Sequence, residues 1–325
     1  MPKRNILERL GSGELLVMDG GTGSELQKRG VNVMKGVTTK QRPKSPLSSK
    51  VKTTTGLGAW SASANLDAPE VVRAIHEDYL NAGAEIIISN NFYTSQAMLS
   101  IVGEEDRWEE YTRRGAELAI QARDAVKPDA YVAGGFAPPL SGDLRKEYEG
   151  QARVLSKAGV DILLAEFLAG DTVHESPIAD CVTAADVCAA TELPVFLGLC
   201  NVTEKGTMQH GESFSDLVTA LKGHRVDGLF LMCSTPEEIS ACMPGLRSAY
   251  DGPIGAYGHF GYDVNPKFGT SPNEPYFVID NTDRTPARYA QFARQWKEMG
   301  VQIIGGCCGT GPDHITALSR VSCAH

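Results

Sequence analysis

The chain has 325 residues, 42% of them hydrophobic, and its 31 Lys and Arg against 40 Asp and Glu give a net charge of −9. This length suits an α/β barrel of about 250 residues with insertions, and the acidic balance argues against nucleic acid or an anionic membrane as partner. No apolar run approaches the ~18 residues that cross a bilayer, and the charged N-terminus lacks an apolar stretch of signal-peptide length. We therefore expect a cytoplasmic protein whose eight cysteines are reduced rather than paired in disulfides.

Short apolar runs, several of them rich in Val and Ile, alternate with helix-like stretches along the whole chain. The eight runs cover residues 15–20, 85–90, 131–137, 161–167, 194–200, 228–233, 253–260 and 301–308. Continuous apolar runs are typical of strands buried on both faces, as parallel sheets require. Eight β–α units predict a (β/α)8 TIM barrel that forms a single domain over residues 1–325, with an open doubly wound sheet as the alternative.

Prolines and glycines mark the ends of several predicted helices. Pro69, Pro236 and Pro286 each begin a helical pattern, and the last of these patterns ends on Gly300, in agreement with the preference for Pro at the first turn and Gly after the last. Pro244 lies inside the second pattern and predicts a break there.

Residues 33–58 interrupt this alternation. The segment is rich in Ser, Thr, Pro and Gly, and it carries six Lys or Arg and no acidic residue. We interpret it as a loop insertion, either a mobile surface loop or a lid over an anionic substrate, because it follows the first strand on the barrel face where active sites lie.

Three cysteines stand where barrel strands end, which is the face that carries the active site. Cys233 ends the sixth run, and Cys307 and Cys308 end the eighth. Adjacent residues of a regular strand point to opposite faces, so both thiols of the pair reach one ion only if the backbone turns, as the flanking glycines in GGCCG permit. Three thiolates would bind Zn²⁺ and leave its fourth tetrahedral position open, as in catalytic sites. The alternative is a buried cysteine pair without a metal.

An open position on such a centre suits a second thiol. Coordination would remove its proton, whereas a free thiol with a pKa of ~8.5 is mostly protonated at neutral pH. The zinc-bound thiolate would then be the nucleophile in a displacement at carbon, in which it attacks a methyl group that is carried by a good leaving group.

Several segments together resemble the homocysteine S-methyltransferase family. The most specific is GGCCGTGPDHI at 305–315, and the segments MDGGTGSELQKRG, AGAEIIISNNFYTS, VDILLAEF and CSTP follow the family's order. The resemblance covers nearly the whole chain except residues 33–58. It implies a zinc enzyme in which the three cysteines hold Zn²⁺ and homocysteine is converted to methionine.

The resemblance also implies a pocket for the amino-acid end of homocysteine. Asp19, with the backbone of Gly20 and Gly21, matches one part of this pocket, and Glu166 matches another. An ammonium group binds carboxylates and a carboxylate binds backbone N–H groups. We therefore expect Asp19 and Glu166 to be catalytic and substrate-binding residues.

The methyl donor is expected to be a small onium compound: betaine, S-methylmethionine or a similar sulfonium. Trp60, Phe92, Tyr93 and Phe167 fall near one mouth of the predicted barrel, where aromatic faces could surround the cation. The segment NFYTS after the second strand resembles the betaine-using branch of the family. That branch has Tyr where this chain has Phe167, so we expect a polar contact to the donor to be missing. Whether the chain is a monomer or a homo-oligomer is left open.

Other classes of function stay open from the residues alone. One alternative is a barrel that binds zinc and thiols without turnover, and another is a methyltransferase that acts on a different thiol. A third is a metal-free lyase with Glu166 and Asp19 as acid and base.

Overall fold

The computed structural model describes residues 3–33, 59–140, 142–169, 176–260, 263–264, 277–278 and 284–323. The strands are β1 (Leu16–Val17), β2 (Ile86–Ile88), β3 (Tyr131–Phe136), β4 (Ile162–Leu168), β5 (Val195–Leu199), β6 (Gly228–Met232), β7 (Ile254–Gly258), β8 (Asp263–Val264), β9 (Phe277–Val278) and β10 (Ile303–Gly306). The α-helices are α1 (Ile6–Gly11), α2 (Thr22–Lys28), α3 (Ala64–Asp67), α4 (Pro69–Asn81), α5 (Gln96–Leu99), α6 (Trp108–Val126), α7 (Leu144–Ala158), α8 (Pro177–Ala189), α9 (Phe214–Ala220), α10 (Pro236–Ala249), α11 (Pro286–Glu298) and α12 (Pro312–Cys323). Three 3₁₀ helices complete the set, namely η1 (Trp60–Ser63), η2 (Ser100–Val102) and η3 (Glu105–Arg107).

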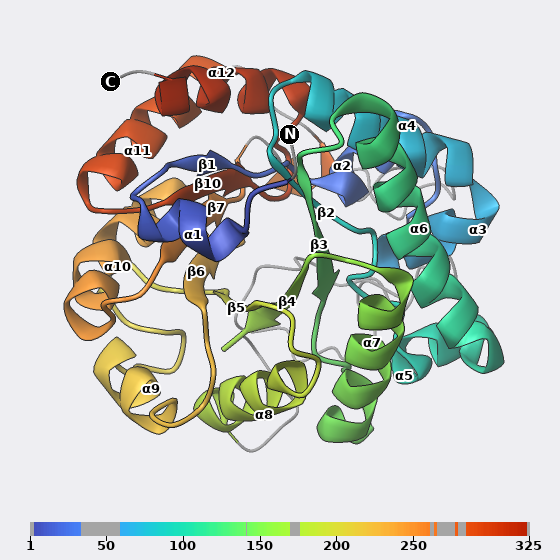
Figure 1. Ribbon diagram of the computed structural model, residues 1–325, viewed down its shortest axis with the longest axis horizontal. Helices are drawn as coiled ribbons and strands as arrows, with labels where there is room; N and C mark the ends of the chain where they lie inside the picture. The colour runs from blue at the N-terminus through green and yellow to red at the C-terminus, as the bar shows by residue number, and fades with distance from the viewer. Residues whose placement is uncertain are drawn as a thin grey trace.

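Eight of these strands form one parallel sheet that curls into a barrel. The strand order is β1-β10-β7-β6-β5-β4-β3-β2, and a parallel bridge between Met18 and Ile86 joins the two ends of the sheet. Helices surround the barrel on the outside (Figure 1). The predicted (β/α)8 barrel is therefore confirmed, and the open doubly wound alternative is wrong because the first and last strands of the sheet meet.

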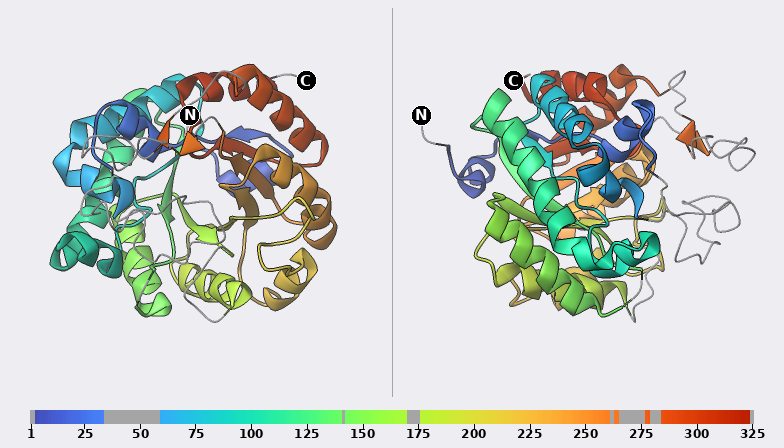
Figure 2. Two further views of the ribbon diagram at one scale, coloured as in Figure 1. Left: turned by 180° about the vertical axis from the view of Figure 1, so that it is seen from behind. Right: turned by 90° about the vertical axis from the view of Figure 1, so that its right-hand side faces the viewer.

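The barrel interior is filled by large apolar side chains that point inward from alternate strand positions. They include Leu16, Ile86, Ile162, Phe196, Phe230 and Ile303, all buried. The side chains of Ile6 and Leu10 on α1 join this cluster. Figure 2 shows α1 at one end of the barrel and the short β8–β9 pair at the other. Helix α1 therefore closes the N-terminal end of the barrel, a role that the sequence analysis did not predict.

The predicted break at Pro244 is wrong, because α10 continues through this residue to Ala249. A capping box between Thr235 and Glu238 holds the first turn, with the Thr235 backbone N–H donating to Glu238 Oε2 at 2.8 Å. In the middle of the helix, Trp296 Nε1 donates to Ser240 Oγ at 2.9 Å. These contacts and the buried apolar face of α10 outweigh the ~3 kcal/mol that an interior proline costs a helix.

Most of the basic segment lies outside the described residues, so its interpretation as a loop or a lid stays a prediction. Of residues 33–58 only Val33 is described, and it is buried. Among the described helices, none combines the length and the apolar character that crossing a membrane requires.

Candidate active site

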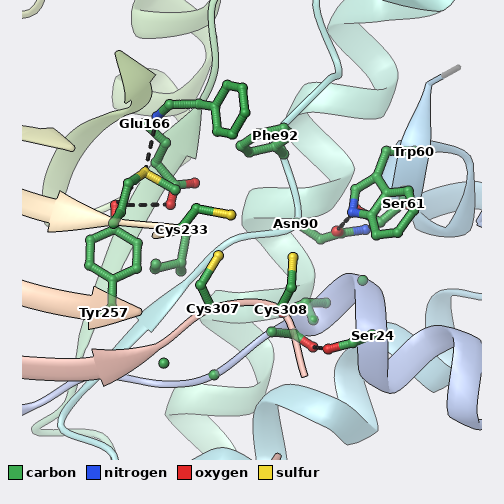
Figure 3. Close-up of a pocket in the computed structure, with 18 of the residues that line it drawn as sticks. Ser24, Trp60, Ser61, Asn90, Phe92, Glu166, Cys233, Tyr257, Cys307 and Cys308 are labelled. Atoms are coloured by element: carbon green, nitrogen blue, oxygen red, sulfur yellow. Dashed lines mark hydrogen bonds between the residues drawn. The ribbon is translucent and has the colours of Figure 1, made fainter. Parts of the chain in front are cut away.

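The three predicted cysteines converge over the C-terminal end of the barrel. Their sulfur atoms all lie within 4.8 Å of one another, and Figure 3 shows the three thiols pointing toward one point. Cys233 directly follows β6 and has a left-handed backbone with φ +44°. Its N–H donates to Tyr257 O at 3.1 Å. This turn out of the strand directs the thiol toward the other two.

The backbone also turns at the cysteine pair. Thr310 N and Oγ1 both donate to Cys307 O, at 3.1 and 2.6 Å. Gly309 has φ +79°, the conformation that a type II turn requires of its third residue, and its N–H donates to Ser24 Oγ at 3.1 Å. Because Cys307 and Cys308 lie in this turn rather than in a regular strand, both side chains can face Cys233.

The three thiols shift one another's pKa values in opposite directions. Hydrogen bonds from Cys233 and Cys307 hold the pKa of Cys308 well below its ordinary value. Hydrogen bonds with Cys307 and Cys308, together with burial, raise the pKa of Cys233 well above its ordinary value. A metal cation at this point would replace protons that the sulfur atoms now share.

The geometry of the cluster fits zinc. Tetrahedral Zn²⁺ with bonds of about 2.3 Å places its sulfur ligands roughly 3.8 Å apart, which small rotations of thiols within 4.8 Å of one another reach. Soft thiolate ligands favour zinc over magnesium or calcium. The three side chains come from two elements of the barrel, so they could supply three ligands and leave the fourth position free.

A cavity of about 130 Å³ opens beside the thiols. Its lining falls into three groups, the glycine-rich turn after β1, an aromatic and polar group, and the residues around the cysteines. The lining residues are Gly20, Gly21, Thr22, Gly23, Ser24, Trp60, Ser61, Ile88, Ser89, Asn90, Phe92, Glu166, Phe167, Met232, Cys233, Tyr257, Gly306, Cys307 and Cys308. The small volume favours a small-molecule substrate.

Glu166 places a buried carboxyl group in the wall of this cavity. It belongs to β4, and Tyr257 Oη donates to its Oε1 at 3.2 Å. Gly135 makes room for it, since a Cβ there would lie 2.6 Å from Glu166 Oε2. Burial raises the pKa of Glu166 to about 8. The carboxyl is thus mostly protonated at neutral pH until a cation binds beside it.

Asp19 lies behind the cavity wall and is fully buried. Its Oδ2 accepts from the Ile88 N–H at 2.9 Å, and among the described residues its Oδ1 has no hydrogen-bond partner. Burial raises its pKa well above the ordinary value, and the nearby Glu166 charge adds to this. An unsatisfied buried carboxyl oxygen is costly, so a donor from a ligand would stabilise it.

The glycine backbone offers less to a substrate carboxylate than the sequence predicts. Gly20 and Gly21 both line the cavity. The Gly21 N–H, however, already donates to Thr310 O at 3.1 Å. In this conformation the Gly21 amide is occupied by the turn that holds the cysteine pair.

Three of the four predicted donor-site aromatics line the cavity. Trp60, Phe92 and Phe167 do so, and the rings of Phe92 and Phe167 meet edge to face with centroids 5.6 Å apart. Tyr93 does not line the cavity, because its ring packs 4.5 Å from Phe92 and is 2% exposed. Tyr93 therefore supports Phe92 from the core side.

Several cavity residues were missed by the sequence analysis. Tyr257 and Met232 flank Glu166, with Tyr257 Oη 3.1 Å from Met232 Sδ. Ser89 is buried, and its Oγ has no hydrogen-bond partner among the described residues. Ser61 also lines the cavity. Ser89 follows β2 directly and precedes Asn90, a residue that the sequence does place at this strand end, so attention to strand ends could have found Ser89 as well.

At the C-terminal ends of its strands, the closed barrel carries a cluster of three thiols and two buried carboxyl groups. These features define a barrel enzyme with a centre suited to a metal ion that thiolates bind. The sequence profile of the homocysteine S-methyltransferase family matches residues 16–322, so the chain belongs to that family. Its reaction is accordingly the transfer of a methyl group to homocysteine, which gives methionine.

Individual relatives agree with this assignment. Betaine–homocysteine S-methyltransferase 1 of Rattus norvegicus is 27% identical over 340 residues, covering 98% of this chain and 74% of the relative. The S-methylmethionine–homocysteine S-methyltransferase of Pongo abelii is also 27% identical, with coverages of 98% and 81%. The structure of the metallated homocysteine methyltransferase MmuM from Escherichia coli superposes with a TM-score of 0.71 at 21% identity, covering 98% of this chain and 99% of that one, which supports the common fold.

Proposed function

We propose that this chain is a zinc-dependent homocysteine S-methyltransferase that takes its methyl group from a small onium donor. The observation that carries the proposal is the convergence of Cys233, Cys307 and Cys308 within 4.8 Å of one another beside a small cavity. Zn²⁺ bound by these residues would hold the homocysteine thiol as a thiolate, which is nucleophilic at neutral pH.

Glu166 would bind the ammonium group of homocysteine, and Asp19, which does not line the cavity, would act from behind the cavity wall. Glu166 lies in the cavity wall, and Asp19 Oδ1 is the buried acceptor without a partner among the described residues. The positive charge of an ammonium group in the cavity would favour the ionised form of both groups. These contacts would fix the substrate so that its sulfur lies next to the cysteines.

The aromatic side of the cavity would receive the donor. Trp60, Phe92 and Phe167 present ring surfaces there, and the negative face of an aromatic ring attracts an onium cation. The relatives named above include enzymes for betaine and for S-methylmethionine. We propose an onium compound of this size as the donor class.

The test measures zinc and turnover on the same reduced preparation. Wild type should contain about one zinc per chain and form methionine from homocysteine with at least one donor from a panel of betaine, S-methylmethionine and dimethylsulfonium compounds. Cys308→Ala should lose both properties. Cys323→Ser is the matched control, because this cysteine is exposed and lies outside the cluster.

Three outcomes would contradict the proposal. Zinc-free wild type that is active would favour metal-free chemistry on the carboxyl groups. Zinc and homocysteine binding without turnover of any donor would favour a binding protein. Retention of zinc and activity in Cys308→Ala would remove the assigned ligand set.

A further inference from the structure

Trp60 has a backbone conformation that its surroundings must hold in place. Its φ is +45°, which is uncommon for a residue other than glycine and persists only where neighbouring contacts fix it. Its indole lies against Gly23, where a Cβ would overlap Nε1. The indole is buried in the wall of the cavity, so its position shapes the side assigned to the donor.

Hydrogen bonds join Ser61, the residue after Trp60, to Asn90, which lies just beyond β2. Ser61 Oγ donates to Asn90 Oδ1 at 2.6 Å, and Asn90 Nδ2 donates back to Ser61 O at 2.9 Å. The same Nδ2 donates to Asn65 Oδ1 at 2.9 Å. Although Asn90 lines the cavity (Figure 3), its amide group is engaged in holding η1.

Asn65 completes the connection from outside the cavity. Its Nδ2 donates to Asn90 O at 2.8 Å and to Tyr111 O on α6 at 3.1 Å. It is fully buried and does not line the cavity. Its polar groups thus join three segments, namely α6, the end of β2 and the stretch that begins with Trp60.

Helix α6 has a glycine where this amide approaches. A Cβ on Gly115 would lie 2.7 Å from Asn65 Nδ2 and 2.6 Å from Asn91 Nδ2. Glycine in a helix interior is unfavourable relative to alanine. The close contact explains why glycine occupies this position, because any larger side chain would push the amide groups away.

We propose that Asn65 is a positioning residue for the methyl donor: through Asn90 and Ser61 it sets the place of the Trp60 indole in the cavity. The inference rests on the proposed function, in which Trp60 contacts the donor. Asn65 itself touches neither substrate. Its removal should therefore change donor use and leave homocysteine and zinc binding intact.

The experiment compares Asn65→Ala with Thr112→Val. Thr112 lies on α6, the helix that Asn65 contacts through Tyr111 O, and it is as buried as Asn65. Its Oγ1 donates to Trp108 O at 2.8 Å, but among the described residues no hydrogen bond connects its side chain to η1. Both variants should lower Tm. Only Asn65→Ala should raise the KM of the donor, by about tenfold for the loss of such buried hydrogen bonds, with zinc content and the homocysteine KM unchanged.

A spectroscopic measurement reports on Trp60 directly. The emission of Trp60 is obtained by subtracting the spectrum of the Trp60→Phe counterpart from the spectrum of each protein. The subtraction cancels the emission of the other two tryptophans. Asn65→Ala should shift this emission to the red and increase its quenching by acrylamide, and Thr112→Val should not. Ser61→Ala, which removes one hydroxyl, should give a smaller change in the same direction if Asn65→Ala fails to fold.

The two measurements separate this inference from the proposed function. If wild type turns over no donor, the proposed function fails, and the Trp60 emission still tests the positioning role. Unchanged Trp60 emission in folded Asn65→Ala, or an equal rise of both KM values, would overturn the inference.

Discussion

The raised pKa of Glu166 predicts that affinity for the amino-acid end of the substrate depends on pH. Methionine is a suitable probe, because it carries the same ammonium group as homocysteine but no thiol that must lose a proton. If the bound ammonium requires ionised Glu166, binding must include the cost of removing the carboxyl proton. With a pKa of about 8, this cost is about 1.4 kcal/mol at pH 7 and about 2.7 kcal/mol at pH 6.

Methionine binding should weaken as the pH falls, because the pKa of Glu166 is raised. A carboxyl whose pKa is raised stays protonated over a wider pH range, so affinity is highest above pH 8 and falls as the pH decreases. Methionine should bind about fivefold more weakly at pH 7 than at pH 8, and about tenfold more weakly again at pH 6. Isothermal titration calorimetry across this range measures the effect.

Glu166→Gln is the matched variant, since it keeps the shape and removes the titrating group. It should bind methionine more weakly at pH 8 and lose the part of the slope that belongs to Glu166, while any contribution from Asp19 remains. Equal slopes in wild type and Glu166→Gln would refute the assignment of the ammonium to this carboxyl. Loss of zinc in the variant would show that Glu166 acts on the metal site.

Two glycine variants and one histidine variant test other parts of the structure. Gly23→Ala should displace the Trp60 indole and raise the KM of the donor. Gly135→Ala, whose Cβ would lie 2.6 Å from Glu166 Oε2, should instead raise the KM of homocysteine. Steady-state kinetics with each substrate varied would contradict this if both variants affected the same KM. His76 is fully buried and burial lowers its pKa to about 4, so the unfolded chain takes up a proton below pH 6.5 that the folded chain does not. Stability should therefore fall by about 3 kcal/mol as the pH decreases from 6.5 to 4, and urea unfolding of His76→Leu should lack this part of the decrease.

The barrel was predictable because its signal is repeated along the chain. Each parallel strand lies within one of the eight predicted apolar runs, except that β4 extends one residue beyond its run, and strands buried on both faces leave such runs in any sequence. The position of the cysteines at strand ends followed from the same pattern. Helix α1 was not predicted, because six residues with two buried side chains carry too little periodic signal.

The finer geometry of the site depends on contacts that no local pattern encodes. Tyr93 and Phe92 are neighbours in sequence, yet only Phe92 lines the cavity. The direction of each ring is decided by what packs against it from other elements. In the same way, the sequence alone suggests that the Gly21 N–H is free to bind a ligand. In the structure it donates a hydrogen bond to Thr310 O, nearly 290 residues away in the chain.

Three non-glycine residues of the cavity wall have left-handed backbones: Trp60 with φ +45°, Phe167 with φ +58° and Cys233 with φ +44°. Each such residue costs about 1–3 kcal/mol, a large share of the 5–15 kcal/mol by which a typical domain is stable. Contacts from other segments hold at least two of them, since Phe167 N donates to Met232 Sδ at 3.0 Å and Cys233 N donates to Tyr257 O at 3.1 Å. All three lie at points where the chain must leave regular geometry to aim a side chain into one small cavity. Part of the backbone strain therefore lies where an aromatic face or a thiol has to be placed, and the regular barrel around it supplies the stability that offsets it.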